Sequence, residues 1–289
     1  MRRATVERPD DHRLDGLRGL RDPDLRRSTE ASHGTFVAEG VAVVERLARS
    51  GYPVLQVVVA PEREAAVVAA LRGADGLEEV PLLVVARPVL DGVVGFPVHR
   101  GVLALGARRP VPDLGGLDPS VRTVVVLEHC NDHENMGAIA RSAWALGAGA
   151  LVLSPRCADP LYRRCVRVSM GQVLHLDLVR VRSWPGAIAA LGLLGFTTLA
   201  LTPAADAVVL DQVAVDADER VALVLGAEGP GLTEGALEAA GRRVRIPIRI
   251  GVDSLNVGHA AAVALHHVAA ARRAAAASDI ALQSSFRQS

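Results

Sequence analysis

The segment LEHCNDHENMGAIARSAWALGAGALVLS, residues 127–154, decides the fold class of the C-terminal half of the chain. It begins at the end of an apolar run, TVVVLE at 123–128, which predicts a buried strand. A helix is expected from about Met136 to Leu146, and ALVLS at 150–154 predicts the next strand. A strand, a helix and a second strand in this order are typical of a parallel sheet covered by helices. The segment therefore indicates an α/β fold.

The same alternation continues towards the C-terminus. The expected elements are a helical stretch near Leu161 to Ser169, a strand at 173–179, a helix from Trp184, strands at 197–202, 221–226 and 243–248, and a last alanine-rich helix from about Leu255. Continuous apolar strands predict a sheet that is buried on both faces. Because ligands bind beyond the carboxyl ends of such strands, the polar loops at those ends are the candidate site.

The N-terminal half predicts a smaller α/β unit, with helix-like and strand-like runs that alternate between about Thr35 and Leu105. A polar, charged stretch precedes this unit, and RRPVPDLGGLDPS follows it with the Pro, Gly and Asp content of a linker. We predict a flexible arm over 1–27, a first domain over 28–107, a linker over 108–120 and a second domain over 121–289.

Composition excludes several classes of protein. The 289 residues carry no net charge, which argues against non-specific coating of nucleic acid, since that mode needs many phosphate contacts. Charged residues interrupt every apolar run and the N-terminus has no apolar signal region, so we expect a cytoplasmic protein. The three cysteines have no C-x-x-C spacing, so neither disulfides nor a metal site is expected.

Three sequence blocks at predicted strand ends contain the candidate functional residues. In the first, Asn135 can cap the following helix, and Arg141 lies on an otherwise apolar helix, where it needs either a ligand or a buried ion pair. In the second, VALVLGAEGPGLT at 221–233, glycines leave bare backbone for a ligand, and Thr233 can cap a helix. Glu228 in this block could pair with an arginine across the loop.

The third block is RVRIPIRIGVDSLNVGHAAAVALHH at 243–267. Its strand ends at Ile246-Pro247-Ile248, and Ser254-Leu255-Asn256 precede the final helix, where Ser254 can serve as the N-cap.

In order, N-x-G-x-x-x-R (135–141), G-x-E-G-x-G (226–231) and I-P followed by S-L-N-V (246–257) resemble the three motifs of the SpoU (TrmH-like) RNA 2′-O-ribose methyltransferases of the SPOUT superfamily. VRVSMGQVLHL (166–176) resembles the family's segment between its first two motifs, and GTFVAEGVAVVERL (34–47) resembles its small ribosomal-protein-like RNA-binding domain. The resemblance implies a trefoil-knotted α/β methyltransferase domain with a parallel sheet, S-adenosyl-L-methionine as methyl donor, and a homodimer through that domain.

The resemblance also implies individual roles. The residues implied in catalysis are Asn135, Arg141, Ser254 and Asn256. Those implied in binding the methyl donor are Leu201, Thr202, Gly226, Glu228, Gly229, Ile246, Ile248, Leu255 and Val257. Local arginine clusters predict the RNA contacts, which are Arg163, Arg164, Arg167 and Arg243. The expected substrate is structured RNA, with ribosomal RNA favoured over transfer RNA.

Several alternatives stay open from the sequence. The same fold could methylate a base nitrogen instead of a ribose, or the chain could be a non-catalytic RNA-binding or ribosome-associated protein. A dehydrogenase is a more distant reading, because the first strand-to-helix turn lacks G-x-G-x-x-G. Guanidinium keeps its proton at ordinary pH, so we expect Arg141 to hold a phosphate and a developing alkoxide, with a histidine base as the minor alternative.

Overall fold

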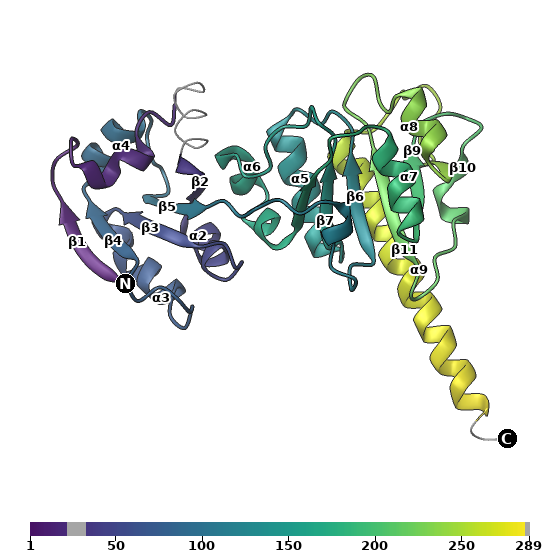
Figure 1. Ribbon diagram of the computed structural model, residues 1–289, viewed down its shortest axis with the longest axis horizontal. Coiled ribbons are helices and arrows are strands. Elements are labelled where there is room, and N and C mark those ends of the chain that lie inside the picture. Colours follow the sequence, from purple (N-terminus) through teal and green to yellow (C-terminus); the bar gives the residue numbers. More distant parts are fainter. Residues whose placement is uncertain (22–32, 287–289) are drawn as a thin grey trace. The chain divides into compact units, whose positions relative to one another are not determined.

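The computed structural model describes residues 1–21 and 33–286, which divide into two compact units (Figure 1). The first unit comprises Met1–Pro110 together with Pro160–His175. The second comprises Val111–Asp159 and the chain from Leu176 onward. No helix in the described ranges is both long and apolar enough to cross a membrane.

The first unit is built on a five-stranded sheet with the order β1-β4-β3-β5-β2. Its strands are β1 (Arg2–Val6), β2 (Thr35–Glu39), β3 (Val54–Val59), β4 (Pro81–Val85) and β5 (Val102–Ala107). Its helices are α2 (Val41–Ala48), α3 (Glu64–Ala70), α4 (Arg87–Val94) and α6 (Arg163–Val168). Strand β5 is antiparallel to both neighbours, and β1, β4 and β3 are parallel, so this unit has the α/β character that the sequence predicted.

The predicted flexible arm over 1–27 is wrong for its first part, because β1 pairs with β4 and a 3₁₀ helix follows at His12–Leu17. Leu14 and Leu17 are fully buried in the core of the first unit. Exposed ion pairs such as Arg13 with Asp11 supply the polar residues that suggested an arm. Residues 22–27 of the predicted arm lie outside the described residues.

The second domain is not the continuous segment 121–289 that the sequence predicted, because Pro160–His175 belongs to the first unit. An ion pair anchors this segment: Arg163 Nη1 on α6 lies 2.8 Å from Glu39 Oε2 at the end of β2. The Glu39 side chain is only 5% exposed, and a buried carboxylate needs a charged or hydrogen-bonding partner. The requirement of Glu39 for a partner cannot be seen in the sequence of α6 alone.

The second unit contains a wholly parallel seven-stranded sheet with the order β10-β12-β9-β11-β6-β7-β8. Its strands are β6 (Thr123–Leu127), β7 (Ala150–Leu153), β8 (Asp177–Arg180), β9 (Phe196–Leu201), β10 (Val208–Val209), β11 (Arg220–Leu225) and β12 (Arg242–Arg245). Every residue of β6 and β7 is buried, as expected for apolar strands covered on both faces. The parallel sheet predicted from the apolar runs is confirmed, although the run at 173–179 begins as a 3₁₀ helix and enters the sheet only at Asp177.

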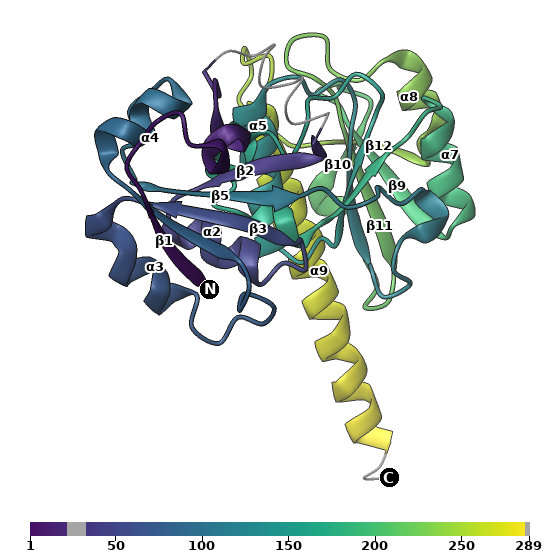
Figure 2. The same ribbon diagram turned by 60° about the vertical axis from the view of Figure 1, so that its left-hand side comes forward.

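Helices cover both faces of this sheet, with α5 and α9 on one face and α7 and α8 on the other (Figure 2). Their bounds are α5 (His133–Ala145), α7 (Gly186–Leu193), α8 (Glu234–Ala239) and α9 (Val257–Phe286). Alternate residues of the central strands, such as Val124 on β6 and Val224 on β11, share a core cluster with Ile188 of α7. The other face is therefore left to α5 and α9.

The strand order brings the carboxyl ends of distant segments together. Strand β11 lies between β9 and β6, and β12 lies between β10 and β9, so later strands occupy positions between earlier ones. The loops that leave β9, β11 and β12 consequently share one edge of the sheet. This edge is the position predicted for a ligand.

Candidate active site

A cavity of about 520 Å³ lies at this edge of the second unit. Three loops form its wall, one after each of β9, β11 and β12, together with the start of α9. The lining residues are Leu201, Thr202, Pro203, Leu225, Gly226, Ala227, Glu228, Gly229, Pro230, Gly231, Leu232, Ile246, Ile248, Ser254, Leu255, Asn256, Val257 and Ala260. The volume falls within the range of small-molecule sites in proteins.

The cavity gathers most of the residues that the sequence singled out. All nine predicted to bind the methyl donor line it: Leu201, Thr202, Gly226, Glu228, Gly229, Ile246, Ile248, Leu255 and Val257. Ser254 and Asn256 line it as well, whereas Asn135 and Arg141 do not. The lining residues that the sequence did not predict all lie within three positions of a predicted one, and they are Pro203, Leu225, Ala227, Pro230, Gly231, Leu232 and Ala260. Their only sequence signal is that proximity.

We call the segment Gly226–Leu232 the glycine loop, and its backbone is folded tightly on itself. Gly231 N donates to Ala227 O at 3.1 Å. A Cβ atom added to Gly226 would lie 2.1 Å from the carbonyl carbon of Gly231 and 2.3 Å from the amide nitrogen of Leu232. Only glycine fits at position 226, because real Cβ atoms do not approach backbone so closely. The loop thus presents bare backbone to the cavity.

Asn256 joins all three sequence blocks at the wall of the cavity. Its Nδ2 donates to Asn135 Oδ1 at 2.9 Å and to Glu228 Oε1 at 2.5 Å. Its Oδ1 accepts from the backbone amides of Gly258 at 2.9 Å and His259 at 3.3 Å, which makes Asn256 the N-cap of α9. One side chain therefore fixes the first turn of α9, the start of α5 and the middle of the glycine loop.

Replacing Asn256 by Asp is expected to weaken binding of S-adenosylhomocysteine by about tenfold or more, because losing a hydrogen bond to a charged group costs ~1.5–3 kcal/mol. Asp keeps the shape and the capping oxygen, but it cannot donate to Asn135 or Glu228, and it places a second carboxylate beside Glu228. Isothermal titration calorimetry measures the effect. The matched control is Asn131→Asp at an exposed position, and equal affinities for both variants and the wild type would contradict the prediction.

Two predicted helix caps are wrong. Asp132, rather than Asn135, caps α5, because its side chain accepts from the backbone amides of Glu134 and Asn135, both at 2.8 Å. Asn256 takes the position proposed for Ser254 at α9. Asn135 is thereby free to bond Asn256 with its side chain. The prediction for Thr233 is confirmed, since its side chain accepts from the amide of Ala236 at the start of α8.

Arg141 is exposed, contrary to the expectation that it lies on a buried helix. The buried face of α5 consists instead of residues such as Met136 and Ile139. In the part of the chain that the structure describes, no hydrogen bond or ion pair joins Arg141 to another side chain or to backbone. Its guanidinium therefore remains available to a partner outside this chain.

Two ionisable groups of the first block, Cys130 and His129, are poorly placed to accept a proton. Burial raises the pKa of the Cys130 thiol to about 12, so this cysteine stays protonated at neutral pH. His129 Nε2 lies 3.3 Å from the Arg156 Nε–H and accepts from it. Glu228 bonds to Asn256, and no arginine among the described residues pairs with it, so the predicted Glu228–Arg contact is wrong. All three cysteines are buried.

The arginines predicted to contact RNA differ in their surroundings. The Arg163 side chain is only 17% exposed, pairs with Glu39 and lies over the Phe96 ring at 4.1 Å, and burial lowers its pKa. Arg163 is therefore not placed to bind RNA, contrary to the prediction. Arg167 lies 3.8 Å from Glu39 and is 38% exposed, and Arg164 is exposed. In the second unit, Arg243 pairs with Glu234 at 2.6 Å.

Comparison with known proteins places this geometry in a family. Residues 122–266 match the model of the SpoU rRNA Methylase family, and this range contains the first two sequence blocks, the third except for its last residue, and the whole cavity wall. An uncharacterized tRNA/rRNA methyltransferase of Mycobacterium tuberculosis is 43% identical over 259 residues, which cover 89% of this chain and 88% of the relative.

Solved structures have the same fold. The AdoMet-bound rRNA methyltransferase of Sinorhizobium meliloti superposes with a TM-score of 0.76 at 24% identity, over 92% of this chain and 97% of that one. A structure described as an RNA 2′-O ribose methyltransferase superposes with a TM-score of 0.73 at 28% identity, over 93% of this chain and 99% of that one. The family model and the mycobacterial relative together show that the chain belongs to the SpoU rRNA methylase family.

Proposed function

We propose that the protein transfers a methyl group from S-adenosylmethionine to the 2′-hydroxyl of a ribose in structured RNA, with ribosomal RNA as the favoured substrate. The observation that carries this proposal is the junction at Asn256, which joins Asn135 of the first block to Glu228 of the second at the wall of one cavity. Membership of the SpoU family and the similarity to a tRNA/rRNA methyltransferase support methyl transfer to RNA, and the similarity to a structure described as an RNA 2′-O ribose methyltransferase supports the ribose hydroxyl as the acceptor.

The cavity suits this methyl donor better than a phosphate-bearing cofactor. Among the described residues that line the cavity, Glu228 is the only acidic or basic one. No arginine lines the cavity to bind a phosphate group. The bound donor would supply an electrophilic methyl group on a cationic sulfonium. Ile246 and Leu255 provide apolar surfaces for a flat base, and the glycine loop provides backbone donors and acceptors.

Methyl transfer to a hydroxyl requires the oxygen to lie in line with the methyl group and to lose its proton. Ser254 and Asn256 line the cavity, and Asn135 adjoins them through its bond to Asn256, so these side chains can orient the ribose. Arg141 provides a planar set of donors that can hold the neighbouring phosphate and stabilise the developing alkoxide. Base methylation by the same fold is the alternative outcome.

We further propose a homodimer in which the Arg141 of one protomer serves the cavity of the other. Asn135 and Arg141 are six residues apart on α5, so their side chains point about 120° apart around the helix axis. Asn135 bonds to the cavity wall, whereas Arg141 is exposed and outside the lining. Exposed apolar side chains on α5 and on α9, Trp144 at 41% and Val263 at 44%, fit a surface that a second copy covers.

The strand order supports the proposed trefoil knot. Strand β12 occupies a position between β10 and β9, and β11 one between β9 and β6, which is compatible with a knotted chain path. The chain after β12 then lines the same cavity as the loops after β9 and β11. For RNA binding by the first unit we retain Arg164 and Arg167, whose side chains reach solvent.

The test is to map 2′-O-methylated riboses in total RNA from cells with and without the gene. One missing methyl group in ribosomal RNA is the expected result, and a missing group in transfer RNA would change the substrate. Mass spectrometry of nuclease digests distinguishes a ribose methyl from a base methyl. Purified protein that does not bind S-adenosylmethionine in calorimetry would contradict the proposal and favour a non-catalytic RNA-binding protein.

A further inference from the structure

Glu128 is a buried carboxylate that none of the three sequence blocks assigned a role. It directly follows β6, its side chain is fully buried, and its backbone amide donates to Leu225 O at 2.8 Å. Within the described ranges, no arginine or histidine forms an ion pair with it. A carboxylate without a cationic partner in the interior must be stabilised by hydrogen-bond donors.

Three donors meet the Glu128 carboxylate. Trp184 Nε1 donates to Oε1 at 2.5 Å, and Thr233 Oγ1 donates to the same oxygen at 2.8 Å. The backbone amide of Thr233 donates to Oε2 at 2.8 Å. Two of these donors, the indole N–H and the backbone N–H, cannot accept a hydrogen bond. Each of the two side-chain oxygens of Glu128 must therefore accept a hydrogen bond.

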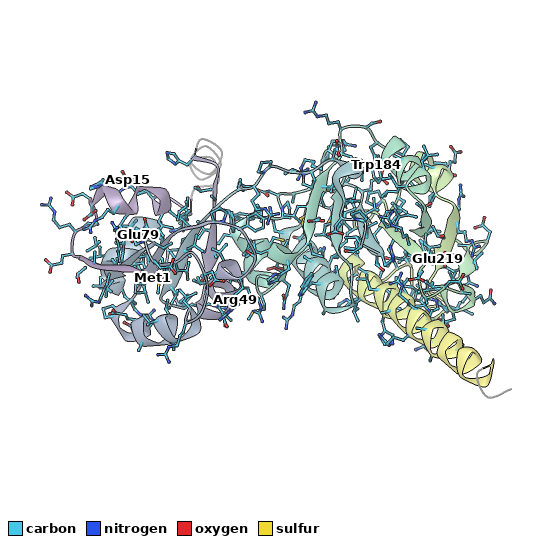
Figure 3. All side chains as sticks on the ribbon, turned by 60° about the horizontal axis from the view of Figure 1, so that its bottom comes forward. Met1, Asp15, Arg49, Glu79, Trp184 and Glu219 are labelled. Carbon is cyan, nitrogen blue, oxygen red and sulfur yellow. The ribbon has the colours of Figure 1, made fainter. Side chains whose placement is uncertain are left out.

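The three contacts connect the core of the second unit to the glycine loop. Trp184, labelled in Figure 3, packs against the core cluster between the sheet and α7. Thr233 directly follows Leu232, the last residue of the glycine loop that lines the cavity, and it is also the N-cap of α8. Glu128 thus fixes the end of the loop to a packed and rigid part of the unit, while Asn256 fixes its middle through Glu228.

We propose that Glu128 is a positioning residue, which holds the glycine loop in the shape that binds the methyl donor. This role rests on the proposed function, since it assumes that the cavity binds S-adenosylmethionine. An amide at position 128 cannot replace the carboxylate. Wherever its NH₂ group lies, it faces either the indole N–H of Trp184 or the backbone N–H of Thr233, and one of those buried donors loses its acceptor.

The experiment measures the dissociation constant of S-adenosylhomocysteine by calorimetry and the midpoint of thermal unfolding for each variant. Glu128→Gln is expected to bind about tenfold more weakly or worse, because leaving a buried donor unsatisfied shifts the loop or costs its desolvation. The matched control is Glu219→Gln. Glu219, also labelled in Figure 3, accepts from Thr197 Oγ1 at 2.6 Å and from the amide of Asp216 at 3.1 Å, and it does not line the cavity.

A second variant separates positioning from general destabilisation. Trp184→Phe removes the indole donor, so in this background the amide of a glutamine at position 128 can turn its NH₂ towards the phenyl ring while its oxygen accepts from Thr233 N. Glu128→Gln is therefore expected to cost less affinity in the Trp184→Phe background than in the wild type. A role confined to overall stability predicts additive losses of melting temperature and no such rescue of affinity.

The outcomes are distinct. Wild-type binding with a selective loss in Glu128→Gln, and none in Glu219→Gln, supports the positioning role. If Glu128→Gln and the wild type bind with equal affinity, the positioning role is overturned and the proposed function stays intact. The same conclusion follows if Glu128→Gln and Glu219→Gln lose affinity equally. Absence of binding by the wild-type protein overturns the proposed function and this role with it.

Discussion

Replacing Gly226 by alanine is expected to weaken binding of S-adenosylhomocysteine by about a hundredfold and to lower methyl transfer with it. The added Cβ would overlap the backbone of Gly231 and Leu232 at 2.1 to 2.3 Å, and no side-chain rotation can relieve a clash between backbone atoms. Overpacking that forces backbone to move costs ~1–3 kcal/mol or more, which corresponds to a loss of affinity of about a hundredfold when the moving backbone is the binding loop. Calorimetry measures this loss directly.

Gly235→Ala is the control for Gly226→Ala. Gly235 lies in the first turn of α8, where an added Cβ would meet Pro185 Cγ at an ordinary distance of 3.5 Å. Alanine is also the better helix former, so this variant is expected to keep both its affinity and its stability. Affinity of Gly226→Ala within a few-fold of the wild type would show that the loop adapts, and the tight backbone contact would then have no functional meaning.

Replacing Arg141 by alanine is expected to lower kcat/KM for methyl transfer by about 10²–10³-fold, as removal of a preorganised donor does in other enzymes. Binding of S-adenosylhomocysteine is expected to stay unchanged, because Arg141 does not line the cavity. Arg141→Lys tests whether the planar guanidinium group is required, since an ammonium group keeps the charge without the bidentate geometry. If Arg141→Lys transferred methyl groups at nearly the wild-type rate with unchanged RNA affinity, the proposed role of the planar guanidinium group would be contradicted.

Mixing two inactive variants tests whether Arg141 acts across a dimer. A mixed dimer of Arg141→Ala and Gly226→Ala would contain one site with an intact cavity from the first chain and an intact arginine from the second. With random exchange of subunits, about a quarter of the wild-type activity is expected to return. No recovery, despite subunit exchange shown by mass spectrometry of the intact complex, would place Arg141 at the cavity of its own chain.

Much of the fold could be predicted from the sequence because its signals are local. Fully apolar runs such as TVVVLE and VALVLG predict buried parallel strands, and those strands form the centre of the observed sheet. Glycines directly after a strand, as at Gly226, indicate close backbone contact. The nine residues expected to bind the donor all lie near strand ends or the start of α9, which explains why they line one cavity.

Errors arose where a residue's surroundings come from distant parts of the chain. Arg163 was expected on the surface, but its side chain is largely buried in the first unit because it pairs with Glu39, 124 residues earlier in the chain. Charged neighbours concealed the strand β1, whose pairing depends on β4. Arg141 was expected on a buried helix, because periodicity cannot show which face of α5 the sheet and α9 leave uncovered.

The sequence by itself determined the three blocks, their order and the parallel α/β unit that contains them, since each depends on short runs of neighbouring residues. Only the tertiary structure decided how the blocks act together. Asn256 reaches Asn135, 121 residues earlier, and Glu128 reaches Thr233, 105 residues later, because β11 and β12 enter positions between earlier strands. Strand order is a property of the whole sheet, and no local pattern of residues specifies it.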